Sequence, residues 1–133
     1  MLRPLTIIIA ISIATSADSD DYKHITDAAY CSGVVSRNID LMKRDLGAVA
    51  PGDPQNLLRF HAIVQGALKL NKIDASTTTR LILVGQQDAE LCWDTSMRCM
   101  NEGLQNKTAD PNKTLANCML QSEHVCKRIV SCN

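Results

Sequence analysis

Residues 92–126 read CWDTSMRCMNEGLQNKTADPNKTLANCMLQSEHVC, and this stretch decides the fold. It contains four cysteines, Cys92, Cys99, Cys118 and Cys126, two on each side of the polar segment 104–109. Asp110-Pro111, directly after that segment, is typical of a helix start. Aspartate accepts a backbone N–H at the cap, and proline is tolerated in the first turn. The stretch therefore predicts two helices joined by a short turn, which makes them antiparallel neighbours.

The spacing of these four cysteines predicts two disulfides between the helices. In an antiparallel pair, residues at the same height have position numbers with a constant sum, because the rise per residue is constant at ~1.5 Å. Cys99 and Cys118 sum to 217, and Cys92 and Cys126 sum to 218. The directions agree less well, since seven residues leave ~20° between Cys92 and Cys99 but eight leave ~80° between Cys118 and Cys126. Disulfide flexibility or distortion near the end of the last helix can absorb this misfit.

The other two cysteines, Cys31 and Cys132, form the third expected bridge and tie the end of the chain to the first helix. The main rival pairing is Cys31–Cys126 with Cys92–Cys132. A zinc site would need close pairs such as C-x₂-C, which the sequence lacks. Because the count is even, we expect no free thiol to act as a nucleophile.

Residues 1–17 are typical of a secretory signal peptide. Arg3 supplies the basic start, residues 5–14 are an apolar run, and small residues 15–17 precede an expected cut after Ala17. An apolar run of this length falls short of the ~20 residues that span a bilayer. An uncleaved anchor or a first core helix is the alternative. Six cysteines behind such a leader indicate a secreted or periplasmic protein whose mature part, residues 18–133, is one disulfide-stabilised domain without a membrane segment.

Apolar residues at three- and four-residue steps predict helices over about 22–46, 53–71, 74–103 and 110–129. Outside the third helix, the expected buried positions are Ile25, Ala28 or Ala29, Val35, Ile39, Met42 and Leu46, then Leu57, Phe60 or His61, Val64, Ala67 or Leu68, and finally Leu115, Cys118, Met119, Ser122, Val125 or Cys126, and Ile129. Residues 77–84 are β-branched enough for a strand, but no partner strand exists, so we interpret them as helix. The fold class is all-α: a four-helix array or bundle stapled by disulfides, with an antiparallel hairpin at its end.

Composition excludes nucleic acid as a partner. Removing Arg3 with the leader leaves 13 basic and 14 acidic residues, a formal charge of −1. Such a balance offers no surface that neutralises phosphates. The aromatic residues are few and scattered, which argues against stacking on bases. They are Tyr22, Tyr30, Phe60 and Trp93.

No pattern of catalytic or metal-binding residues is present, and we expect no cofactor. His24, His61 and His124 match no ligand spacing, and a structural role is the ordinary interpretation of each. The third helix carries four acids, Asp88, Glu90, Asp94 and Glu102, but Asp88 and Asp94 are six residues apart and do not converge on one face. An ion pair between Asp94 and Arg98, four residues on, is the ordinary explanation there.

Three residues outside the cysteine set are candidate sites. Trp93 is suited to anchor a partner, although packing against the disulfides is the simpler role. Asn106 and Asn112 each begin an N-x-T sequon, which in a eukaryotic secretory pathway marks a glycosylated, exposed turn.

The leading functional hypothesis is a non-enzymatic protein-interaction module, an inhibitor or an immunity-like protein, whose partner is another exported protein. The alternative is a carrier of a small apolar ligand, for which Met42, Met97, Met100 and Met119 supply an adaptable lining. An enzyme without a recognisable motif is the third choice.

The disulfide ladder gives a direct test. The double variant Cys92→Ser/Cys126→Ser is expected to keep its helical circular dichroism and to melt several degrees lower, because a bridge stabilises by roughly 2–4 kcal/mol through the unfolded chain. Non-reducing digestion and peptide mapping of the wild type read the bridges themselves. A peptide joining Cys92 to Cys132, or a free thiol in the oxidised protein, would contradict the pairing.

Overall fold

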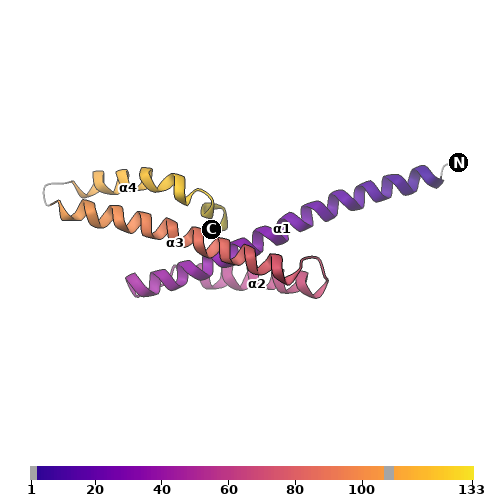
Figure 1. The fold of residues 1–133 in the computed structure, drawn as a ribbon, viewed down its shortest axis with the longest axis horizontal. Coiled ribbons are helices and arrows are strands. Elements are labelled where there is room, and N and C mark those ends of the chain that lie inside the picture. Colours follow the sequence, from indigo (N-terminus) through magenta and orange to yellow (C-terminus); the bar gives the residue numbers. More distant parts are fainter. Residues whose placement is uncertain (1–2, 107–109) are drawn as a thin grey trace.

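The computed structural model describes residues 3–106 and 110–133, with side chains from residue 19 onward. Four α-helices and a short 3₁₀ helix follow one another, and the described residues contain no strand (Figure 1). They are α1 (Arg3–Leu46), α2 (Asp53–Lys69), α3 (Ala75–Gln105), α4 (Pro111–Cys126) and η1 (Ile129–Cys132). The all-α fold class is confirmed. None of the described helices combines the length and the apolar character needed to cross a bilayer.

The predicted ends of the helices are mostly confirmed by local capping. Gly47 adopts the left-handed conformation after α1, and Asn71 does so after α2. Asp74 caps α3 by accepting the Thr77 N–H at 2.6 Å, and Asp110 caps α4 by accepting the Asn112 N–H at 3.0 Å. The β-branched segment 77–84 lies within α3, so its interpretation as helix is correct.

Two expectations about helix ends, the start of α1 and the end of α4, were wrong. α1 starts at Arg3 instead of residue 22, because nothing after Pro4 interrupts the helical run. α2 starts at Asp53 as predicted, and Gly52 before it occupies the cap position without a side-chain cap. α4 stops at Cys126, and Ile129 begins η1.

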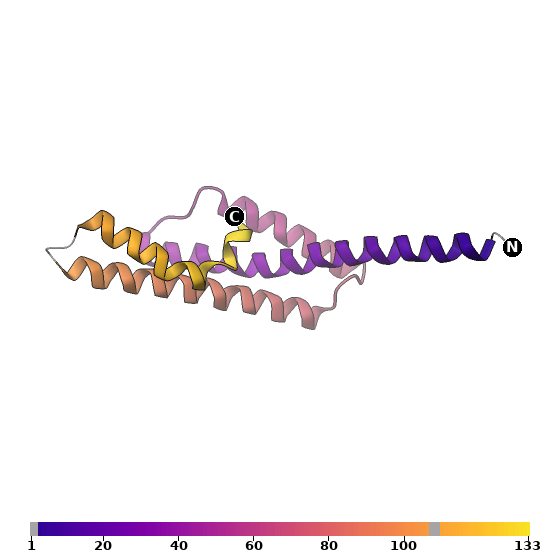
Figure 2. The ribbon, with the colours of Figure 1, turned by 90° about the horizontal axis from the view of Figure 1, so that it is seen from above.

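The core lies where α1 is flanked by α2 and α3 (Figures 1 and 2). Its buried side chains are small: Val34, Val35 and Ala89 with the Cys31–Cys132 bridge form one cluster. Ala28, Ala29 and Val64 form a second cluster, and Ile25, Ala67 and Ile73 form a third. With so little aromatic volume, the helices must approach closely to exclude water.

Some expected core positions are exposed. Leu46 is 58% exposed, and Leu41 takes the buried place instead, because the C-terminal end of α1 runs past α2 and away from the α3–α4 pair (Figure 1). Leu115 and Met119 are 49% and 66% exposed, since α4 packs on α3 through Cys118 and Ser122. The described part of α4 therefore leaves an apolar side uncovered.

Disulfides join the C-terminal elements to the rest of the chain. The structure pairs Cys92 with Cys126 and Cys99 with Cys118, as the constant sum predicts, and joins the remaining Cys31 to Cys132. It leaves no free cysteine among the described residues. The Cα–Cα distances between α3 and α4 are 4.9 and 5.6 Å. The angular misfit falls on Cys126, the last residue of α4. Residues 107–109 of the predicted turn lie outside the described residues.

Two glycines set the crossing of α1 and α3. A Cβ built on Gly33 would overlap the carbonyl oxygen of Ile82, and one on Gly85 would overlap that of Tyr30. The two backbones are therefore in direct contact, with one glycine contributed by each helix. No larger residue fits either position unless the helices move apart.

These contacts predict opposite effects for three glycine-to-alanine variants. Gly33→Ala and Gly85→Ala are each expected to destabilise the fold by about 1–3 kcal/mol, because the added methyl meets backbone atoms. Gly66→Ala is the matched control, since nothing lies within 4 Å of its added Cβ in α2. It should instead stabilise by about 0.5–1 kcal/mol. Urea denaturation checks all three, and equal effects at the three positions would contradict the close crossing.

Candidate binding cleft around Trp93

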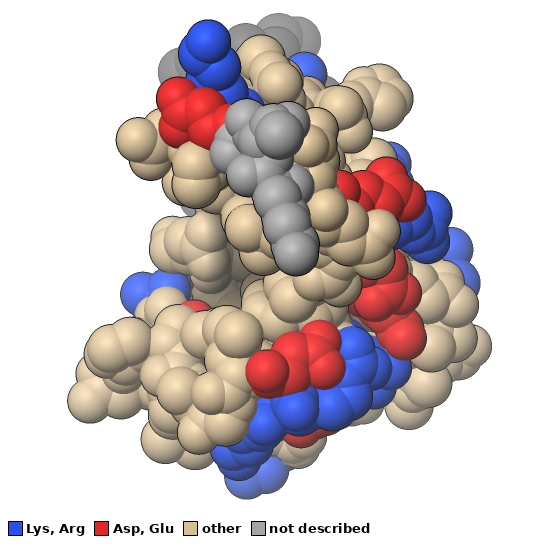
Figure 3. Space-filling view, turned by 90° about the vertical axis from the view of Figure 1, so that its left-hand side faces the viewer, with Lys and Arg blue, Asp and Glu red and all other residues tan. Residues whose placement is uncertain are grey.

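A cleft opens where α1 and α3 separate beyond their crossing. The C-terminal end of α1 and the α3–α4 pair run apart at the same end of the molecule (Figure 1), and the surface is hollowed between them (Figure 3). Three adjoining hollows, of about 380, 460 and 660 Å³, make up this region. We call them the central, apolar and outer hollows, and together the Trp93 cleft.

The central hollow lies between α1, the start of α2, α3 and η1, and its walls include Met42, Trp93 and Met97. The apolar hollow lies between α3 and α4, and its walls include Met100 and Met119. Ser96 lines both of these hollows. Trp93 and Met97 line both the central and the outer hollow. The shared residues place the three hollows next to one another.

The methionines and the tryptophan that the sequence analysis suggested as binding residues lie close together in the structure. Met42, Met97, Met100 and Met119 come from three helices, yet all four line the Trp93 cleft. They are all the methionines after Met1, and Trp93 is the single tryptophan of the chain. Both functional hypotheses from the sequence therefore point to the same place.

Trp93 is fixed at the wall of the cleft by a bond to α1. Its indole Nε1 donates to Oδ2 of Asp45 at 2.6 Å, and Arg44 donates to the same carboxylate at 2.8 and 2.9 Å. The Arg44 guanidinium, and after it the indole N–H, lowers the pKa of Asp45 to about 2. The carboxylate is charged at neutral pH and anchors the half-buried ring through the indole N–H. Trp93 is not confined to packing on the disulfides.

The cleft is lined by more acids than bases. The basic lining residues are Arg44 and Arg98, and the acidic ones are Asp45, Asp53, Asp94, Glu102 and Glu123. Arg44 is already paired with Asp45. Burial raises the pKa of Asp53, which stands in the central hollow. The chain as a whole is neutral, so negative charge is concentrated here.

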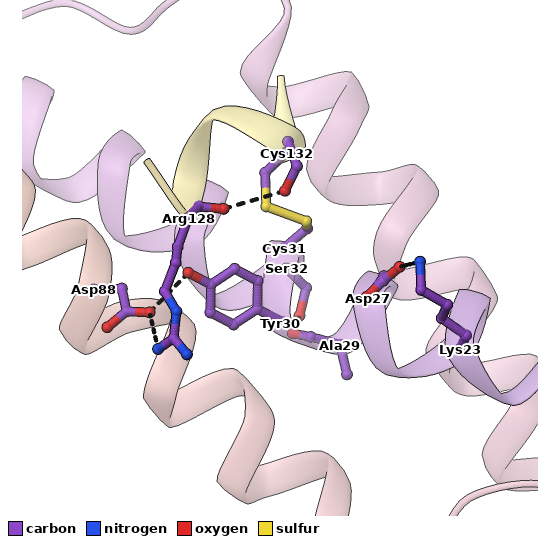
Figure 4. The surroundings of a disulfide bond; sticks show 10 residues. Lys23, Asp27, Ala29, Tyr30, Cys31, Ser32, Asp88, Arg128 and Cys132 are labelled. Carbon is purple, nitrogen blue, oxygen red and sulfur yellow. Dashed lines mark hydrogen bonds and ion pairs between the residues drawn. A yellow bond between two sulfur atoms is a disulfide. The ribbon is translucent and has the colours of Figure 1, made fainter. Parts of the chain in front are cut away.

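The C-terminal segment is fixed beside the first disulfide. Tyr30 of α1 donates to Oδ2 of Asp88 on α3 at 2.8 Å, and Arg128 approaches the same oxygen at 3.8 Å (Figure 4). Burial, and then this hydrogen bond, raises the pKa of Tyr30. The Cys31–Cys132 bridge lies next to these residues (Figure 4). The segment so held carries Ile129 into the wall of the central hollow.

The other candidate residues do not gather. His24, His61 and His124 are exposed on three different helices. Asp88 binds Tyr30, Glu90 pairs with Arg37 at 2.8 Å, and Asp94 lines the outer hollow. The expected Asp94–Arg98 ion pair is absent from the described contacts, although both residues line the same hollow. Across the described residues, no three His, Cys, Asp or Glu side chains are placed to hold a metal ion.

Asn106 and Asn112 are both exposed. They follow α3 and begin α4, one on each side of residues 107–109. Asn106 lies in the cap position of α3, and Asn112 is the second residue of α4. Their glycosylation stays a prediction.

Two members of the cleft, Asp45 and Asp53, could not be recognised from the sequence as site residues. Asp45 is 48 residues from Trp93, and Asp53 lines the central hollow with Trp93 although it opens a different helix. Neither residue belongs to a local motif. No protein-family model, curated protein or solved structure matches this chain.

Proposed function

We propose that this protein is a non-enzymatic interaction module, of the inhibitor or immunity type, that binds another exported protein through the Trp93 cleft. The observation that carries the proposal is the gathering of the only tryptophan and four methionines on one open, acid-rimmed surface. Tryptophan is enriched among residues that dominate binding energy at interfaces. Methionine adapts its shape to a partner at little cost.

The exposed apolar residues beside the cleft support this use. Met119 is 66% exposed and Leu120 is 69% exposed, and both line the apolar hollow with Leu115. Large apolar patches on a protein surface mark interaction sites. Disulfides from α3 to α4 fix the two walls of this hollow before any partner arrives. A preformed surface loses little conformational entropy on binding, which favours affinity.

Three disulfides fit a protein that folds in an oxidising, extracellular or periplasmic compartment. Export by a leader cut after Ala17 is part of the proposal. The N-terminal part of α1 projects beyond the other helices in both ribbon views (Figures 1 and 2). Tertiary contacts of described side chains begin at Asp21, which pairs with Lys72 at 2.8 Å, and at buried Ile25. The cut would also leave Asp18, Asp20 and Asp21 in the first turn, where carboxylates favour a helix.

One observation favours the second candidate, a carrier of a small apolar ligand. The apolar hollow measures about 460 Å³, which is within the range of small-molecule sites, and its lining is mostly Met, Leu and Cys. A carrier and an interaction module would use the same walls. The two functions differ in what is bound when the protein is purified from its own source.

The test is capture of a partner from that source by the disulfide-bonded protein, read by native mass spectrometry. The wild type is expected to carry a protein in fixed stoichiometry. Met97→Lys/Met119→Lys should lose it, because two charges are placed in the apolar walls of the cleft. Leu70→Lys is the matched control, since Leu70 is 68% exposed at the end of α2. It should bind like the wild type.

Far-UV circular dichroism and thiol counting establish that each variant is folded and oxidised. A stoichiometric lipid or other small apolar molecule in place of a protein would overturn the interaction module in favour of the carrier. A protein partner that survives the double lysine variant would place the interface elsewhere and contradict the role of the cleft.

A further inference from the structure

We propose that the group that fills the Trp93 cleft is an amphipathic α-helix of the partner, with basic residues along its polar edges. This inference rests on the proposed function and names the class of partner. It follows from the geometry of α3 and α4, from the residues between them and from the charge around the cleft.

The apolar hollow is a groove between α3 and α4. On α4, Leu115, Met119, Ser122 and Cys126 recur at steps of three and four residues, so they share one side of the helix. Ser96 and Met100 are also one turn apart and form the facing wall on α3. Two antiparallel helices with a shared apolar side leave a groove that a third helix fills in a bundle. α1 does not fill it here, because the C-terminal end of α1 runs apart from the α3–α4 pair (Figure 1).

The groove is long enough to hold the apolar anchor residues of a bound helix. From Leu115 to Cys126 the wall rises by ~16 Å, which is about three helical turns. Helices that bind in grooves insert apolar anchors at i, i+3 or i+4, and i+7, which span about two turns. Met97 and Trp93 extend the same apolar surface into the central hollow. A bound helix can therefore place its anchors along the apolar hollow and reach the tryptophan with its end.

The acidic residues around the cleft favour a bound helix that carries basic residues. Glu123 lines the apolar hollow, Asp53 stands in the central hollow, and Asp94 and Glu102 line the outer hollow. Asp53 makes no side-chain hydrogen bond or ion pair among the described contacts, and its raised pKa reflects partial burial. A lysine or arginine placed beside it would relieve that unfavourable burial of charge. Complementary charge of this kind also speeds association and rejects acidic partners.

The single tryptophan makes binding directly visible. We would titrate the full-length, disulfide-bonded protein with an 18-residue peptide of Leu and Lys, with Leu at i, i+3, i+4 and i+7 and no tryptophan. The emission of Trp93 is expected to shift to shorter wavelength as the ring loses water, with a micromolar Kd. The same peptide with Glu for Lys, and a permuted Leu/Lys peptide without an apolar stripe, should each bind about tenfold more weakly or worse.

Two double variants test whether the preference for the basic peptide comes from the acidic residues of the cleft. Asp53→Asn/Glu123→Gln is expected to weaken the basic peptide about three- to tenfold and to reduce its salt dependence, because two carboxylates leave the cleft. Asp20→Asn/Asp27→Asn removes the same charge from the exposed face of α1 and serves as control. That variant should bind the basic peptide like the wild type.

If the basic and acidic peptides bind with equal affinity, the proposed preference for basic partners is wrong. The same holds if both double variants lose equal affinity for the basic peptide. Binding of the permuted peptide as tightly as the amphipathic one would overturn the helix. Either failure leaves the proposed function standing if the native partner is still lost in Met97→Lys/Met119→Lys. If that partner is retained there while the peptide results hold, the cleft binds helices and the proposed function is wrong.

Discussion

The direct backbone contact between α1 and α3 is the constraint on which the remaining structure depends. Gly33 lies against the carbonyl of Ile82, and Gly85 lies against that of Tyr30. The backbones of two long helices that cross in this way separate on either side of the crossing, and longer side chains then bridge the gap, as Arg37 does to Glu90. On one side α2 fills the space, with Val64 and Ala67 buried. On the other side the helices separate around Trp93, and the space between them becomes the cleft.

The disulfides support the part of the molecule that the core does not reach. The buried clusters centre on α1 and its contacts with α2 and α3, and their members are mostly valine, alanine, isoleucine and cysteine. Only Cys118 and Ser122 are buried on α4. Two covalent links to α3 hold that helix in place without an apolar core of its own. Its apolar residues Leu115, Met119 and Leu120 can therefore remain on the surface.

Sequence alone predicts those features of this fold that depend on constant local geometry. The rise per residue is fixed, so the sums of Cys92 with Cys126 and Cys99 with Cys118 predict their pairing. Capping is also local, and Asp74 and Asp110 act as their positions suggest. Four helices without a strand follow from periodicity of the same kind.

What the sequence does not predict depends on the path of α1 across α3. The glycines of the crossing belong to no motif, so the divergence that exposes Leu46 and buries Leu41 cannot be foreseen. The bond from Trp93 to Asp45 joins positions 48 apart. Four methionines on three helices converge only once that crossing is known.

The most direct measurement of the central claim is a methionine-methyl NMR spectrum of the oxidised protein, alone and bound to the partner captured from its own source. Every methionine after Met1 lines the Trp93 cleft, so the spectrum reports on that surface. The account predicts that the signals of Met42, Met97, Met100 and Met119 shift on binding, together with the indole N–H of Trp93. A saturated complex in which these signals keep their free positions would contradict it.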